Sequence, residues 1–126
     1  MKRIIILAWL FVLSSTLFAQ QTFFLNDPQA AFKQAKEYFQ KEYYSLAYPL
    51  FRELQSVQRE GEVTEQSVNS QELRYYTLVC GLKQGDSGAA VGARQFIDLE
   101  NNQARGEMMS FHLAEYYFRE KNYKEA

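Results

Sequence analysis

The sequence predicts an all-α protein built from antiparallel pairs of helices. Three observations carry this prediction. Apolar residues after position 27 recur at intervals of three and four, which is the spacing of one helix face. Most of the segments between these runs are short and rich in Gly, Asn and Asp, so consecutive helices can pack side by side. No stretch of the chain favours a strand.

Residues 1–19 have the three-part layout of a secretory signal peptide. Lys2 and Arg3 precede an uncharged apolar run, and Ala19 offers a small residue for cleavage. The departure from the pattern is Leu17, where a small residue is expected. The alternative is an uncleaved membrane anchor, although the apolar stretch is shorter than the roughly 20 residues that span a bilayer. We therefore expect an exported protein.

Cleavage after Ala19 leaves 107 residues, which is enough for one small domain with a thin core. Without Lys2 and Arg3, 12 basic residues stand against 15 acidic ones, a net charge of −3. This balance is unlike the basic stripe of a nucleic-acid binder. Cys80 is the only cysteine, so an internal disulfide and a lipid-modified cysteine directly after the signal are excluded. We expect Cys80 to be buried, and the alternative is a free exposed thiol.

Helix signals divide the rest of the chain into successive elements. Residues 20–27 form an extended lead, and Asp27 can cap a helix that begins at Pro28, where the missing N–H is not needed. Pro49 removes one hydrogen bond from the second helix, with limited damage near the helix start. The expected helices cover about 28–41, 43–59, 67–84, 89–100 and 104–120, and a sixth begins near Tyr123.

Two stretches that lie 79 residues apart match without a gap. Residues 34–47 read QAKEYFQKEYYSLA, and residues 113–126 read LAEYYFREKNYKEA. In both, a small residue is followed by Tyr three positions later and by Ala nine positions after that. The matched pairs are Ala35 with Ala114, Tyr38 with Tyr117, Phe39 with Phe118, Tyr44 with Tyr123, and Ala47 with Ala126.

This pattern resembles the tetratricopeptide repeat, in which a small residue precedes Tyr, then Ala, then an aromatic residue four positions on. Ala47 and Phe51 complete the pattern in the first copy. The separation of the copies equals two periods of roughly 34 residues plus an insertion, so a middle copy is required. Ala93 and Ile97 repeat the spacing of Ala47 and Phe51, which leaves the surplus in the polar linker that begins near residue 60.

The resemblance implies a right-handed superhelix, an α-solenoid, that is incomplete at the C-terminus. About two and a half repeats are expected, at 28–60, 66–101 and a truncated 104–126, so that the chain reads as the start of a longer solenoid. The chain is also similar to the N-terminal part of large exported tetratricopeptide proteins of Bacteroidetes-type bacteria. The alternative is a generic helical bundle whose internal similarity arose by chance.

No catalytic, cofactor-binding or metal-binding residue is predicted. A metal site at His112, the only histidine, would need Glu115 or Met108 at helical spacing, and a packed or solvated residue is the simpler interpretation. The Gly-rich stretch from Gly85 follows a helix rather than a strand, unlike a phosphate loop. No nucleophile and base are tied together. We expect no enzyme activity and no cofactor in this segment.

The resemblance also implies a binding surface. Stacked helix pairs curve, and the first helix of each pair lines the concave side, where a peptide or a partner helix docks. The inner positions lie three before and four after the small residue, whose place Leu78 takes in the middle copy. The residues expected to bind a partner are Phe32, Lys36, Phe39, Tyr75, Leu82, Phe111, Glu115 and Phe118. The alternative is that these residues pack between repeats and never meet a ligand.

The predicted function is a non-enzymatic, exported helical-repeat scaffold that binds a protein or peptide. It would act in the periplasm or at the outer membrane of a Gram-negative cell, with membrane contact only through the signal segment before cleavage and no nucleic-acid partner. The alternatives are a signal-anchored envelope assembly factor, or the repeat portion of a longer enzyme.

The mature protein is predicted to begin at Gln20, because signal peptidase cleaves after a small residue such as Ala19. Mass spectrometry of the N-terminus, on protein from the envelope fraction of its native cell, measures this directly. An N-terminus at Met1 in the same fraction would instead support the membrane anchor.

Overall fold

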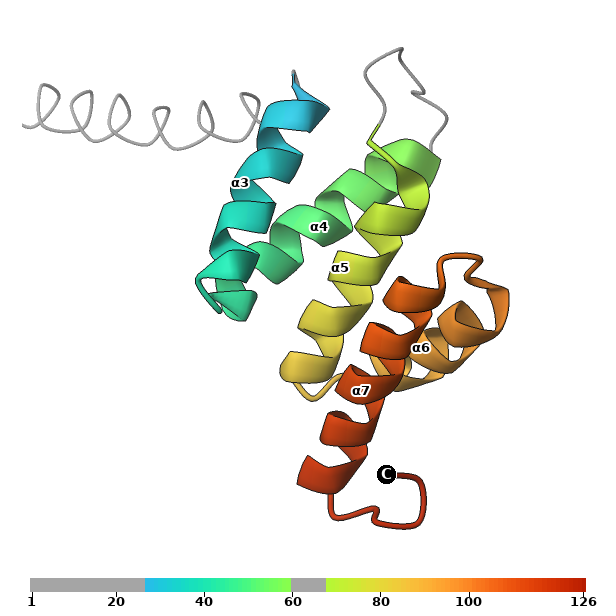
Figure 1. Cartoon of the computed structure of the whole chain (residues 1–126). Coiled ribbons are helices and arrows are strands. Elements are labelled where there is room, and N and C mark those ends of the chain that lie inside the picture. Colours follow the sequence, from blue (N-terminus) through green and yellow to red (C-terminus); the bar gives the residue numbers. More distant parts are fainter. Residues whose placement is uncertain (1–26, 60–67) are drawn as a thin grey trace, which may run out of the picture.

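The computed structural model describes residues 27–59 and 68–126, which form five α-helices and no strand (Figure 1). The helices are α3 (Pro28–Gln40), α4 (Tyr44–Arg59), α5 (Ser70–Lys83), α6 (Ser87–Leu99) and α7 (Gln103–Arg119). The all-α prediction is confirmed, and every helix boundary lies within three residues of the expected one. The predicted signal segment 1–19 and nearly all of the expected lead lie outside the described residues.

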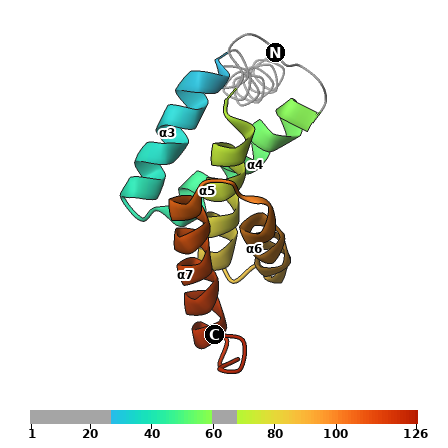
Figure 2. The same cartoon turned by 45° about the vertical axis from the view of Figure 1, so that its right-hand side comes forward.

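Consecutive helices pack against each other, and alternate helices stack. Each helix contacts the next one along the chain, and α5 also contacts both α3 and α7. Among the described helices, α4 and α6 make no direct helix contact, and neither do α3 and α7. Figures 1 and 2 show α3 and α4 at one end of the molecule, α6 and α7 at the other, and α5 between them. The result is an open, solenoid-like stack, since a closed bundle would bring the first and last helices together.

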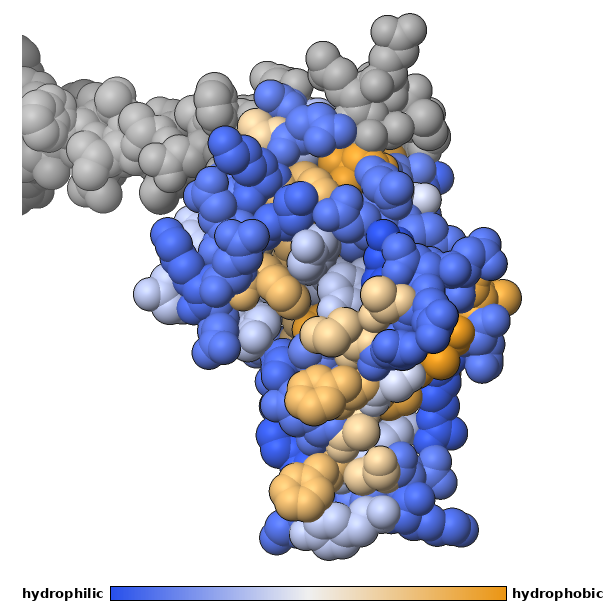
Figure 3. Space-filling view, in the orientation of Figure 1, coloured by the Kyte–Doolittle hydropathy of each residue, from blue (hydrophilic) through white to orange (hydrophobic). Residues whose placement is uncertain are grey.

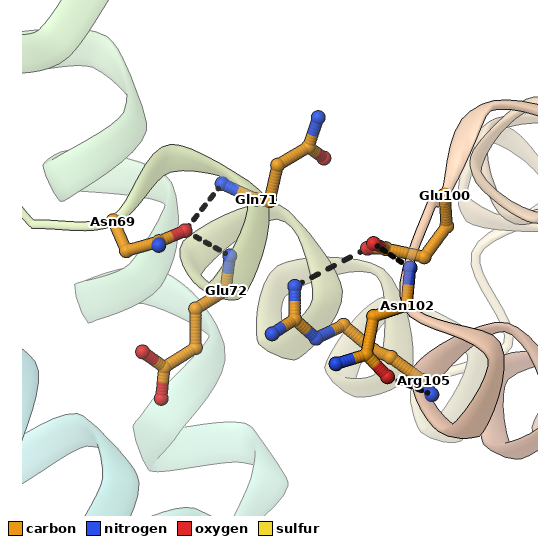
Figure 4. Close-up of polar contacts among 6 residues, drawn as sticks. All are labelled: Asn69, Gln71, Glu72, Glu100, Asn102 and Arg105. Carbon is orange, nitrogen blue, oxygen red and sulfur yellow. Dashed lines mark hydrogen bonds and ion pairs between the residues drawn. The ribbon is translucent and has the colours of Figure 1, made fainter.

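Side-chain caps determine where the helices begin. The Asp27 carboxylate accepts two hydrogen bonds of 3.0 Å from backbone N–H groups in the first turn of α3, as the sequence predicted. Asn69 accepts hydrogen bonds of the same length from the backbone N–H groups of Gln71 and Glu72 (Figure 4). This cap is the reason why α5 begins at Ser70, three residues later than expected.

The connection between α6 and α7 is held by three polar contacts (Figure 4). Glu100 accepts a hydrogen bond of 2.9 Å from the backbone N–H of Asn102 and an ion-paired one of 3.2 Å from the Arg105 guanidinium. The Asn102 side chain in turn accepts from the backbone N–H of Arg105 at 3.0 Å and caps α7. These contacts close the short loop that turns the chain back on itself.

The same backbone turn ends α3, α5 and α7. Its first mark is one residue with a positive φ: Glu42 at 60°, Gly85 at 79° and Lys121 at 58°. Its second mark is a 2.9 Å hydrogen bond from the next backbone N–H to the carbonyl five residues back: Tyr43 to Tyr38, Asp86 to Gly81, and Asn122 to Tyr117. This is the Schellman arrangement, which satisfies the last carbonyls of a helix and redirects the chain.

The shared turn sets the register between the three segments. Counted from the residue with positive φ, Ala47 corresponds to Ala90 and to Ala126. Ala90, and not the expected Ala93, therefore occupies the equivalent place after α5, so the sequence comparison was wrong by three residues, about one helical turn. The intervals become 43 residues from Ala47 to Ala90 and 36 residues from Ala90 to Ala126.

The expected sixth helix is reduced to a turn within the described residues. The backbone N–H groups of Glu125 and Ala126 both bond to the carbonyl of Asn122, at 3.2 Å. The equivalent bonds after the first turn, from Leu46 and Ala47 to the carbonyl of Tyr43, are 3.0 Å long and belong to the start of α4. The hydrogen-bond pattern after α7 is thus that of a helix start.

Two hydrophobic clusters fill the stack, and α5 contributes to both. The first lies among α3, α4 and α5, where the rings of Phe51 and Tyr76 stack with their centres 5.4 Å apart. The second lies among α5, α6 and α7 and includes the fully buried Phe96 and Met109. Cys80 is buried in the first cluster, as predicted, and burial raises the pKa of its thiol to about 12. The thiol is therefore protonated and unreactive in the folded protein.

The middle helix pair exchanges large and small residues relative to the other two segments. Gly81 stands where the matched stretches have Tyr, and a Cβ added there would lie 2.6 Å from the Cβ of Ala89. Leu78 stands where they have Ala, and its Cδ2 would lie 2.7 Å from a Cβ added at Gly92. Gly81 and Gly92 thus let α5 and α6 cross closely, although this helix pair lacks the Ala and Tyr that occupy the crossing in the matched stretches.

Gly81→Ala is predicted to lower the free energy of unfolding by about 1–3 kcal/mol, because the new methyl group would overlap Ala89. Gly106→Ala is the matched control, since nothing lies within 4 Å of an added Cβ at this helical site. There we expect a gain of about 0.5–1 kcal/mol from helix propensity. Urea unfolding followed by circular dichroism measures both. Equal shifts of the two midpoints would contradict the close crossing.

Candidate partner-binding surface

Four of the eight residues expected to bind a partner pack between helices. Phe32 and Leu82 lie in the core, with 5% and 1% of their surfaces exposed, so the expectation that they face a partner is wrong. Phe39 and Tyr75 are half-buried, with ring centres 4.8 Å and 5.4 Å from that of Tyr76. Burial raises the pKa of the Tyr75 hydroxyl. The reason is that α5 covers this side of α3, while α6 and α7 cover α5.

Two more of the eight residues form ion pairs that link stacked helices. Lys36 of α3 lies 3.3 Å from a carboxylate oxygen of Glu72 of α5, and Lys83 of α5 lies 2.6 Å from one of Glu115 of α7. The hydrogen bond from Lys83 is the main cause of the lowered pKa of the Glu115 carboxyl. Both pairs are partly exposed and screened, so each contributes about 0–1 kcal/mol. Their role is to align α3 with α5 and α5 with α7.

His112 is packed beside Glu115 on α7. Its Nδ1 atom is buried without a hydrogen-bond partner and lies 3.8 Å from the nearer carboxylate oxygen of Glu115. Burial is the main cause that lowers the pKa of the imidazole, and the nearby Lys83 charge acts in the same direction. In the described part of the chain, no group of three or more His, Cys, Asp or Glu side chains is suited to a metal ion.

The last two of the eight, Phe111 and Phe118, lie on an exposed face of α7, with 63% and 66% of their surfaces accessible. Met108 and Tyr123 lie near them at 50% and 65% exposure, and the rings of Phe118 and Tyr123 pack edge to face with centres 5.6 Å apart. In Figure 3 apolar side chains follow α7 along this face. We call Met108, Phe111, Phe118 and Tyr123 the α7 row.

Met108 and Tyr123 were not predicted as binding residues, although the sequence held the signal for both. Met108 lies three residues before Phe111, so helical spacing alone places it on the same face. Tyr123 follows the turn after α7, and its match with Tyr44 of the first stretch indicated that this aromatic residue belongs to the repeat. The missing information was exposure, which depends on neighbouring helices.

A second surface feature, a groove between α4 and the start of α6, was not predicted from the sequence. It is lined by side chains of α4, by the outer face of α5 and by the cap of α6. At its narrow end the Tyr48 hydroxyl donates a 2.7 Å hydrogen bond to Asp86. This bond is the main cause of the lowered pKa of the Asp86 carboxyl. Three arginines line it, Arg52, Arg59 and Arg74, and we call it the basic groove.

Comparison of the chain with models of protein families, with curated proteins and with solved structures gives no match. A search of the described residues for a helix both long and apolar enough to cross a membrane also finds none.

Acidification from pH 7.5 to 5.5 is predicted to lower the free energy of unfolding. The pKa of His112 is lower in the folded chain than in the unfolded one, so the unfolded chain binds the proton first. His112 is the only histidine, so His112→Gln should flatten this dependence. Urea titrations at both pH values measure it. A parent protein that gains stability on acidification would contradict the buried neutral imidazole.

Proposed function

We propose that this chain is a non-enzymatic helical-repeat scaffold of the tetratricopeptide type, which is exported to the cell envelope and binds a protein or peptide there. The observation that carries the proposal is the turn that ends α3, α5 and α7, with its positive φ and its 2.9 Å hydrogen bond in all three places. The turn joins two helices into a pair, and the first helices of successive pairs stack on one another. Such a recurring helix pair is the unit of a solenoid. The right-handed superhelix is part of the proposal.

Two features of the sequence support the remaining parts of this proposal. The layout of residues 1–19 supports export to the periplasm or the outer membrane. The ungapped match between residues 34–47 and 113–126 supports the tetratricopeptide type, and the common turn lies inside both stretches. The occurrence of the same turn at Gly85 supports a third, more divergent copy between them.

The α7 row is the surface that we assign to the partner. Aromatic side chains bury a large area at a small cost in conformational entropy and often dominate protein interfaces. Met108, Phe111 and Phe118 recur at intervals of three and seven, so they present one face of α7. The opposite face of α7, with Met109 and Leu113, is buried against the second cluster. A partner segment with a matching apolar face, such as an amphipathic helix, would cover the row.

Site-specific photo-crosslinking in the native cell tests this function. A photo-reactive phenylalanine analogue is placed singly at Phe111, at Phe118 and, as the control, at Leu99 of α6, which is equally exposed at 66%. We expect one and the same protein to be crosslinked from the two α7 positions and not from position 99, with mass spectrometry as the readout. No crosslink, or the same products from all three positions, would contradict the α7 row as the binding face.

The identified partner then permits a measurement of affinity. Phe118→Ser should weaken binding by about tenfold or more, because the aromatic ring would no longer be buried in the interface. Leu99→Ser should leave the affinity unchanged. Equal affinities of the two variants would show that the crosslinks reported proximity only.

A further inference from the structure

We propose that the basic groove binds an acidic, extended segment of a partner protein through Arg52, Arg59 and Arg74. This surface shares no residue with the α7 row, which was assigned to an apolar partner face. The inference extends the proposed function to a second site of different chemistry. Because the two surfaces use different side chains, either proposal can fail while the other stands.

The groove runs along α5 beside α4, and only its narrower part is lined by residues at the start of α6, which makes no direct helix contact with α4. Its wider part has a volume of about 530 Å³ and its narrower part about 180 Å³. Both parts are lined by Gln55, Arg59, Thr77 and Leu78, so they form one continuous channel. Thr77 and Leu78 belong to α5, which forms the floor. The combined volume is of the size that holds a small ligand or a few residues of a peptide.

The charge of the groove is strongly one-sided. Its cationic lining residues are the three arginines, and its only acidic lining residue is Asp86 at the narrow end. The Asp86 carboxylate is already engaged, because one oxygen accepts from the Tyr48 hydroxyl and the other from the backbone N–H of Gly88. The lining therefore carries an excess of positive charge without a free carboxylate to balance it.

The three arginines also have no ion-pair partner among the described residues. The five ion pairs of the described chain use Lys36, Lys83, Arg94, Arg105 and His112. The guanidinium groups of Arg52 and Arg74 lie over aromatic rings, 5.7 Å and 6.0 Å from the ring centres of Tyr48 and Phe96. The Arg52 charge also helps to lower the pKa of the nearby Asp86 carboxyl. Guanidinium groups that form no ion pair within the described residues can donate hydrogen bonds to an external anion.

Carboxylates suit this arrangement well. The planar guanidinium of an arginine donates two parallel hydrogen bonds to a carboxylate, which gives both affinity and orientation. Gln55 adds an amide that can bond a peptide backbone, and Leu78 offers an apolar contact for the stem of a glutamate. The Gln58 amide is already held by the carbonyl of Val68 at 2.6 Å, which keeps the wide end in shape.

The spacing of the arginines indicates the form of the segment. Arg52 and Arg59 are seven residues apart on α4, which corresponds to about 10 Å along the helix axis. In a polyproline-type extended chain, residues three apart lie on the same face and are separated by about 9 Å. Acidic residues at every third position of such a segment would therefore match the two arginines.

A protein segment fits better than a nucleic acid. The whole chain has a formal net charge of −1, so it carries no overall excess of positive charge that would attract a polyanion. Nucleic acids are held by basic stripes that neutralise many phosphates along a backbone. Three arginines in a short channel can instead bind a few carboxylates. The groove therefore suits an acidic peptide, and preferential binding of a nucleic acid would contradict the proposal.

The test measures binding of a defined probe to the full-length protein. The probe is a fluorescein-labelled peptide with three glutamates separated by pairs of prolines. The control peptide has the same sequence with glutamine in place of each glutamate. We expect saturable binding of the glutamate peptide by fluorescence anisotropy at low ionic strength, and binding about tenfold or more weaker for the glutamine peptide. Added salt should weaken the interaction. Equal binding of both peptides would overturn the proposal.

Variants locate the binding site. The double variant Arg59→Gln with Arg74→Gln should lose about tenfold or more in affinity. The matched control, Lys33→Gln with Lys41→Gln, removes the same charge from exposed positions away from the groove and should bind as the parent does. Melting followed by circular dichroism confirms that both variants fold. Equal affinity of the two double variants, or tighter binding of a labelled single-stranded oligonucleotide than of the glutamate peptide, would overturn the proposal.

One further variant separates this proposal from the proposed function. Phe118→Ser lies in the α7 row and should leave binding of the glutamate peptide unchanged. If that substitution abolishes peptide binding while Arg59→Gln with Arg74→Gln does not, the peptide binds at the α7 row and the basic groove is not its site.

Discussion

In three places a backbone N–H reaches back to the carbonyl five residues earlier, across one residue with positive φ, and the path of the whole chain depends on this contact. The bond satisfies carbonyls that the end of a helix leaves free, and it fixes the angle at which the chain leaves. Gly85 adopts this conformation without strain, whereas Glu42 and Lys121 hold it at a modest cost. Because the turn is the same each time, the second segment of every pair starts in the same register.

The turns place α3, α5 and α7 in one stack, and α5 is the helix that joins its two halves. It lies in both hydrophobic clusters, and its side chains meet those of all four other helices. Lys36 with Glu72 and Lys83 with Glu115 align the stacked helices at their partly exposed edges. Apolar contacts therefore hold the stack together, while the weaker ion pairs favour one alignment.

The same stacking explains why two surfaces of opposite chemistry occur. Where the first helices stack, apolar side chains are covered until α7, whose outer face carries the exposed α7 row. On the other side α4 and α6 stay apart, and the groove that runs over α5 beside α4 is lined by Arg52, Arg59 and Arg74. An exposed aromatic face and an open basic channel are thus two results of one arrangement of helices.

The sequence by itself determined five helices to within three residues of their ends, because caps such as Asp27 and spacing along one helix are local properties. It also determined the match of the two stretches and the burial of Cys80. Only the tertiary structure decided which of the aromatic side chains in matched positions meet solvent. Phe39 and Phe118 hold matched positions, yet the first is half-buried under Tyr76 and the second is 66% exposed. The physical reason is that exposure depends on the helix that packs alongside, and the basic groove likewise unites arginines from two separate helices.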